Sequence, residues 1–228
     1  MPNSTLVFVK RSLSLSKIFS GMGLFFGGLG VLIIYLLSIF SGYSNIILYL
    51  TFFPFLVFGI MMFSTPVLLL YVYDKNNGVL EYLLSLGWNQ GDIFKQYLKA
   101  ALFLALTLFV AEFVAVIIAG VLSGLQAVFL LDLSVLLLTA AFGFSVVSLT
   151  TTAMMAFSAL QKQRVGANSP LALGIGAVFI VPTFYLPAVG GFGVGFLIDL
   201  SIALLAAALS IALLILSSRL IRREKMLP

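Results

Sequence analysis

Residues 73–95 read YDKNNGVLEYLLSLGWNQGDIFK and form the only long polar stretch between apolar runs. The stretch predicts a short helix, a turn and a second helix. Asn77 is expected to be the N-cap, and Glu81 lies in the first turn, where the helix dipole favours an anion. Gly87 is a natural C-terminal stop. Asn89 then begins a second helix, which continues into the next apolar run.

The short helix, expected at residues 77–86, has an apolar face. Leu80, Leu83 and Leu84 share that face, because residues three and four apart are neighbours on a helix. The helix is too short to cross a bilayer, which takes about 20 residues. Its apolar face therefore needs a cover, and either lipid headgroups or the groove of another protein would supply one.

Outside this segment the chain is strongly apolar. Of its 228 residues, 62% are hydrophobic and only 8% are charged, whereas soluble domains carry roughly 25% charged residues. Such a chain cannot cover a water-facing surface, which excludes an ordinary cytosolic enzyme. The chain has no His and no Cys, which excludes metal sites built from these residues, thiol nucleophiles and disulfides.

The apolar runs predict an all-α membrane protein with six transmembrane helices. A helix needs about 20 apolar residues to span the hydrocarbon core, and six runs are expected to do so: residues 19–40, 46–73, 97–121, 130–160, 171–189 and 196–216. Residues 1–18 alternate basic and apolar positions and predict an N-terminal interfacial helix. Residues 74–95 are expected to form a cytoplasmic loop and 217–228 a basic cytoplasmic tail. Residues 1–228 are thus expected to form a single transmembrane domain.

The placement of positive charge predicts the orientation. With six spans and a cytoplasmic N-terminus, all 12 Lys and Arg residues fall on the cytoplasmic side. The positive-inside rule therefore predicts a multi-pass protein of the cell membrane with both termini in the cytoplasm. The net charge of +5 is then a signal of topology that also attracts anionic membrane lipid, and no nucleic acid partner is expected.

The cytoplasmic loop at residues 74–95 resembles the ABC type-2 transporter permease family, the membrane subunits of ATP-driven exporters. The shared pattern is acidic-x-x-Asn-Gly-x-Leu-Glu-x-Leu-Leu-Ser-Leu, followed by a turn and a hydrophobic-Lys start to the third span. It is carried by Asp74, Asn77, Gly78, Leu80, Glu81, Leu83, Leu84, Ile93 and Lys95. The strict match covers about a tenth of the chain. The chain departs from the family at Val79, which is usually Thr, at Gly87, where Pro is common, and at Asn76, usually an acid.

This resemblance implies that residues 1–228 form a single transmembrane permease domain and that residues 74–95 are its cytoplasmic coupling loop. It also implies that the permease forms a homodimer or heterodimer and is driven by a separate ABC ATPase subunit, on which ATP and Mg are bound. The chain has no G-x-x-x-x-G-K-[ST] phosphate loop, so it is not expected to be an enzyme itself or to hold a cofactor. In the family the short helix couples to the ATPase. The implied contact residues are Asp74, Asn77, Gly78, Leu80, Glu81, Leu83, Leu84 and Trp88. The implied cargo is hydrophobic or amphipathic, and a haem-exporter-type membrane subunit of cytochrome c maturation is the alternative within the class.

A competing function centres on Glu112, near the middle of the third span. A carboxyl group inside a membrane is costly and marks a functional site by default. Glu112, Thr150 and Thr151 are candidates for a translocation path, and a proton-coupled secondary transporter using Glu112 is the alternative from another class. The structural reading is a protonated carboxyl that hydrogen-bonds to a neighbouring helix, for example to the Thr/Ser face of the fourth span.

Two further features are expected to be structural. Gly23-x-x-x-Gly27 predicts a close contact between helices, because glycines let two backbones approach. Asp132 and Asp199 lie near the predicted outer ends of their spans, where they are expected to be solvated at the interface.

Overall fold

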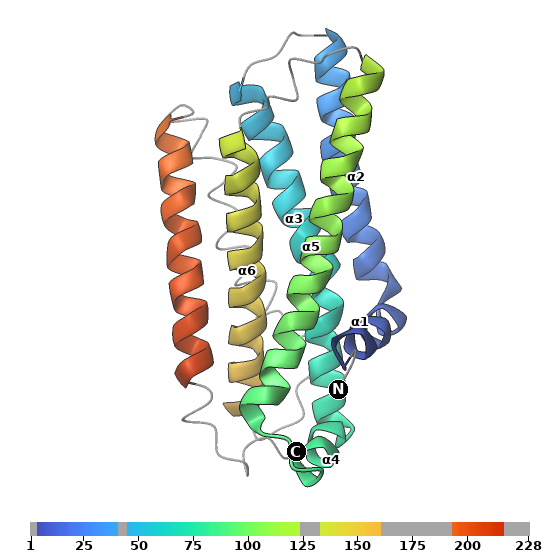
Figure 1. Ribbon diagram of the computed structural model, residues 1–228, viewed down its shortest axis with the longest axis vertical. Helices are drawn as coiled ribbons and strands as arrows, with labels where there is room; N and C mark the ends of the chain where they lie inside the picture. Colours follow the sequence, from blue (N-terminus) through green and yellow to red (C-terminus); the bar gives the residue numbers. More distant parts are fainter. Residues whose placement is uncertain (1–3, 41–44, 124–132, 161–192, 217–228) are drawn as a thin grey trace.

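The computed structural model describes residues 4–40, 45–123, 133–160 and 193–216, and every element among them is a helix. The helices are α1 (Ser4–Leu15), α2 (Lys17–Phe40), α3 (Asn45–Asn76), α4 (Val79–Ser85), α5 (Gln90–Ser123) and α6 (Leu133–Leu160), followed by a last helix at Gly193–Leu216. The long helices lie side by side, α1 lies across them, and α4 lies at one end beyond α3 and α5 (Figure 1). The predicted all-α class is confirmed.

Four of the described helices are long and apolar enough to cross a membrane. These stretches lie in α3, α5 and α6 and at Gly193–Leu216. The bent pair Thr5–Leu15 and Lys17–Ile33, which meets at 93°, makes a fifth candidate if it is taken as one broken span. The predicted span at 171–189 lies outside the described residues, so the count of six stays a prediction.

Helix α3 forms the centre of the bundle. It runs unbroken for 32 residues through Pro54 and Pro66. Its side chains Leu56, Ile60 and Tyr71 are almost fully buried among the surrounding helices. In contrast, α5 and the last helix keep long rows of exposed apolar side chains, among them Leu106, Val110, Leu204 and Ile211. Exposed apolar rows of this kind suit contact with lipid.

The predicted glycine contact is present between α2 and α3. A Cβ atom on Gly23 would lie 2.7 Å from the backbone nitrogen of Phe63, and one on Gly59 would lie 3.0 Å from the backbone nitrogen of Gly27. The two backbones therefore touch directly over this stretch. The glycines join two helices of one chain, which accounts for the motif without a second copy.

Helix α1 departs from the direction of α2 by the 93° bend. One face of α1, including Phe8, Val9 and Ser12, is buried against the rest of the bundle, while Leu6 and Val7 are exposed. The amphipathic helix predicted at residues 1–18 is thus present at Ser4–Leu15. Its inner face packs on protein.

Candidate functional site

The turn between α3 and α4 is formed by Asn77 and Gly78. The side-chain Nδ2 of Asn77 donates a hydrogen bond of 2.9 Å to the carbonyl of Tyr73, so it caps the end of α3. Gly78 occupies the N-cap position of α4 with φ 72°, a left-handed conformation that suits glycine. The prediction of Asn77 as the N-cap is therefore wrong, because the left-handed residue that reverses the chain is Gly78. Helix α4 is also shorter than the expected 77–86.

The end of α4 follows the prediction. Gly87 has φ 85°, and its N–H donates to the carbonyl of Leu84 at 3.1 Å, while the N–H of Trp88 donates to Leu83 at 3.2 Å. These two bonds make a Schellman motif, which satisfies the last carbonyls of the helix. The carbonyl of Asn89 then accepts bonds from the first turn of α5, so a second helix begins there as predicted.

The inner face of α4 packs on the chain's own core. Leu80 and Leu84 are buried together with Ile93 and Phe94 of α5, and Trp88 is partly buried against the same cluster. The expectation that this apolar face needs a cover from lipid or a partner is therefore corrected. The chain's own core, with residues from α3 as well as α5, supplies the cover, which the helical periodicity of α4 alone cannot show.

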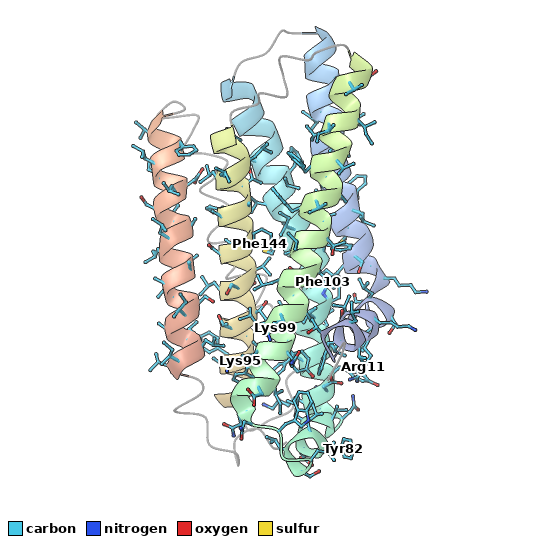
Figure 2. The ribbon with its side chains drawn as sticks, viewed as in Figure 1. Arg11, Tyr82, Lys95, Lys99, Phe103 and Phe144 are labelled. Atoms are coloured by element: carbon cyan, nitrogen blue, oxygen red, sulfur yellow. The ribbon has the colours of Figure 1, made fainter. Side chains whose placement is uncertain are left out.

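The outer face of α4 exposes two large apolar side chains. Tyr82 is 63% exposed and Leu86 is 58% exposed, and Tyr82 lies at the end of the molecule (Figure 2). Both are missing from the contact residues predicted by resemblance. Their signal in the sequence is the spacing of four residues, which places them on one face, opposite Leu80 and Leu84.

The eight predicted contact residues divide between surface and interior. Asn77 is exposed, and Gly78, Glu81, Leu83 and Trp88 are half-buried. The remaining three are buried, and their side chains are not available on the surface of the described chain: Asp74, Leu80 and Leu84.

Asp74 is fully buried and joins three helices. Arg11 of α1 donates two hydrogen bonds to its carboxylate, at 2.6 Å to Oδ1 and 3.3 Å to Oδ2. The hydroxyl of Tyr97, on α5, donates to Oδ2 at 2.5 Å. Paired bonds from a guanidinium are among the strongest interactions a carboxylate makes. The sequence analysis missed this cluster, because Arg11 and Asp74 are 63 residues apart and no local pattern joins them.

Aromatic packing fixes the position of Tyr97. Its ring meets Phe8 of α1 edge to face, with centroids 4.8 Å apart, and Tyr71 of α3 at 5.1 Å. One turn before Phe8 on α1, the hydroxyl of Thr5 donates a hydrogen bond of 3.1 Å to Oε1 of Gln96, the residue that precedes Tyr97. Helix α1 is therefore attached to the base of α3 and α5 by both apolar and polar contacts.

Glu112 lies in the bundle interior, with 6% of its surface exposed. A Cβ atom on Gly27 would collide with its carboxyl group, so Glu112 packs against α2. The expectation of a hydrogen bond to the threonine face of the fourth span is not met. Gly27 adjoins Gly59 of α3, and the next residue of α3, Ile60, contacts Gly143 of α6. Thr150 is seven residues farther along α6, about 10 Å at the helical rise.

The threonine hydroxyls of α6 bond within their own helix. Thr150 donates to the carbonyl of Val146 at 2.9 Å and Thr151 to that of Val147 at 2.7 Å, as such residues commonly do. Both side chains are buried. The structure does not bring them together with Glu112, and their role in a translocation path stays a prediction.

The last helix contacts α6 through small polar residues. The hydroxyls of Ser148 and Ser210 are hydrogen-bonded, and Thr152 donates to Ser210 at 3.5 Å. Asp199, on the same helix, is fully buried, which corrects the expectation that it is solvated. Burial follows from its position on the face that packs inward. Asp132 lies outside the described residues.

No protein-family model matches the chain, and no curated protein or solved structure gives a significant match. The relationship to ABC type-2 permeases therefore stays a prediction that rests on residues 74–95.

Proposed function

We propose that this chain is the membrane-spanning permease subunit of an ATP-driven transporter, an exporter of hydrophobic or amphipathic cargo. The observation that carries the proposal is the two-sided character of α4. Leu80 and Leu84 anchor its inner face to the core, while Tyr82 and Leu86 are exposed at the end of the molecule. Large aromatic and apolar side chains on a short, fixed helix are typical anchors of a protein interface.

The proposed arrangement in the membrane follows from the exposed apolar rows and the charge pattern. The chain is a multi-pass protein of the cell membrane, with α4 and both termini in the cytoplasm. Lys17 at the start of α2 and Lys99 on α5 are exposed, and exposed apolar side chains follow each of them, such as Ile18 and Phe103. This change from cation to apolar surface marks the proposed cytoplasmic interface.

In the proposed mechanism a separate ATPase subunit, which binds ATP and Mg, receives α4 in a surface groove. ATP binding closes the ATPase pair and moves α4. Because Leu80 and Leu84 are buried in one core cluster with residues of α3 and α5, and Gly78 lies in the turn that joins α4 to α3, this motion passes to α3 and α5 as a tilt. The tilt opens a path between two permease copies. This chain performs no covalent chemistry in the cycle.

Purification in mild detergent from the native cell tests the proposal. An ATPase with a phosphate-binding loop is expected to co-purify in stoichiometric amounts. A single-chain oligomer that moves substrate without an ATPase would contradict it. If the co-purified complex carried haem as its cargo, the chain would instead be a haem-exporter-type membrane subunit of cytochrome c maturation, the alternative within the same class.

The double variant Tyr82→Asp/Leu86→Asp is expected to weaken ATPase binding at least tenfold, since it places charges in the proposed apolar contact. Both side chains are exposed, so the fold should be retained. Tyr82→Phe is the matched control and should bind as the native chain does. Binding is measured by titrating purified ATPase onto the permease in nanodiscs. If the double variant bound the ATPase with native affinity, α4 would not be the docking element.

The second candidate function uses the buried carboxyl group of Glu112. A proton-coupled secondary transporter requires that this group gain and lose a proton during transport. The permease proposal requires only that it fill the space beside Gly27, which a glutamine also does. The two candidates therefore differ in what the substitution Glu112→Gln does.

Under the permease proposal, the Glu112→Gln complex is expected to keep at least half of the native ATP turnover. The shape of the side chain is preserved and ATP is hydrolysed elsewhere. The measurement is ATP hydrolysis by the purified complex, with assembly checked by gel filtration. A normally assembled complex with turnover reduced more than tenfold would place Glu112 in the mechanism.

A further inference from the structure

The proposed contact with the ATPase does not use Asp74, because its side chain is buried in the last turn of α3. The carboxylate lies where α1, α3 and α5 meet, immediately before the turn into α4. It accepts two bonds from Arg11 and one from Tyr97. Asp74 thus connects α3 to both α1 and α5.

Separating α1 from the other two helices would carry a large energetic cost. A carboxylate that is buried in protein and loses its cationic partner is strongly destabilising. The same separation would break the edge-to-face contact of Phe8 with Tyr97 and the bond of Thr5 to Gln96. A joint movement of α1 with the base of α3 and α5 keeps all of these interactions.

We propose that Asp74 is a positioning residue that fastens α1 to the α3–α4–α5 hairpin, so that α1 moves together with α4 when a partner engages α4. The inference rests on the proposed function for its partner. The attachment itself is a property of this chain alone. Because of this attachment, α1 moves as one unit with α3, α4 and α5. The exposed face of α1, which carries Leu6, Val7 and Lys10, therefore shifts with each movement of α4.

Distance measurement between spin labels tests the attachment. The chain has no Cys, so label pairs are introduced cleanly. The reporting pair is Lys10→Cys on α1 with Lys95→Cys at the start of α5, both exposed positions. The control pair is Leu106→Cys on α5 with Leu137→Cys on α6, also exposed, which reports whether the bundle stays intact.

In the native background the reporting pair is expected to give one narrow distance distribution. Asp74→Asn should widen it at least twofold and leave the control pair unchanged. Unchanged width of the reporting pair would overturn the inference. If Asp74→Asn also widens the control pair, the bundle itself is disturbed, and Tyr97→Phe is measured instead, because it removes one hydroxyl and retains the ring. Tyr97→Phe should then widen the reporting pair and leave the control pair unchanged, and an unchanged reporting pair would overturn the inference.

The complex with the ATPase supplies the second readout. Addition of ATP and vanadate should leave the mean distance of the reporting pair unchanged, while a shift would overturn the joint movement. Tyr97→Phe should lower ATP turnover several-fold at unchanged subunit stoichiometry, which a purely structural role would not do. If no ATPase is found, the proposed function fails, and the comparison without ATPase still decides whether Asp74 fastens α1.

Discussion

Replacing Gly23 by alanine is expected to lower the free energy of unfolding by about 3 kcal/mol, as overpacking of a tight contact does. The added Cβ would lie 2.7 Å from the backbone nitrogen and 2.8 Å from the Cα atom of Phe63. Backbone atoms of a packed helix cannot move aside individually, so α2 and α3 must separate. The measurement is thermal unfolding of the purified chain in detergent.

Two other glycines of α2 are matched controls for this substitution. Gly21 and Gly28 have nothing within 4 Å of an added Cβ. Alanine there is expected to be neutral or stabilising by up to about 1 kcal/mol, since alanine favours the helix over glycine. Equal effects of Gly23→Ala and Gly21→Ala would show that the α2–α3 contact is looser than described.

Gly27→Ala should fall between these cases. Its added Cβ meets the carboxyl group of Glu112, and the end of a flexible side chain yields more easily than a backbone.

Replacing Arg11 by alanine is expected to cost about 3 kcal/mol of stability, because it leaves the carboxylate of Asp74 buried without its cation. Arg11 is partly exposed, with 40% of its side-chain surface accessible, which holds the expected cost to the lower part of the usual range for buried pairs. Chemical denaturation in detergent, followed by circular dichroism, measures the loss.

The control for this prediction is Lys10→Ala. Lys10 is the adjacent residue on α1, carries the same charge and is exposed, so its removal should change stability by less than about 0.5 kcal/mol. In the double variant Arg11→Ala/Asp74→Asn the buried group is neutral, and the cost should be smaller than that of Arg11→Ala alone. A double variant that is less stable than Arg11→Ala would contradict the assignment of the effect to the stranded carboxylate.

Both predictions bear on how the proposed coupling element is supported. The glycine contact fixes α2 to α3 along the bundle, and the Asp74 cluster fixes α1 to the base of α3 and α5. Helix α4 is therefore attached to a group of helices, α1, α2, α3 and α5, that are held together by both contacts. A force applied at Tyr82 and Leu86 would move this group of helices in preference to bending α4 alone.

Local chemistry determined the features that the sequence predicted correctly. The run of apolar residues indicates long helices because each must satisfy its own backbone hydrogen bonds when surrounded by apolar groups. The stop at Gly87 and the start at Asn89 depend on residues within one turn. The tight glycine contact at Gly23 was also predictable, since a missing side chain permits close approach whatever the partner is.

Features that depend on distant residues were not determined in this way. The cover of Leu80 and Leu84 comes from a core cluster that includes residues of α3 and α5, and the position of Glu112 beside Gly27 depends on how α2 packs against α5. For this reason the sequence did not indicate that Glu112 packs against α2, and its suggested bond to the fourth span is not present among the described residues. Asn77 was misassigned because the reversal after α3 needed a left-handed residue, and Gly78 adopted that conformation.

By itself, the sequence determined that this protein contains long apolar helices and a short helix within the polar segment 73–95, because composition and helical spacing are local properties. Only the tertiary structure decided that Asp74 is an internal anchor and that Tyr82 and Leu86 form the exposed surface of α4. The physical reason is that burial depends on which distant helix covers a face. The guanidinium of Arg11, 63 residues away, is what allows a carboxylate to lie in the interior.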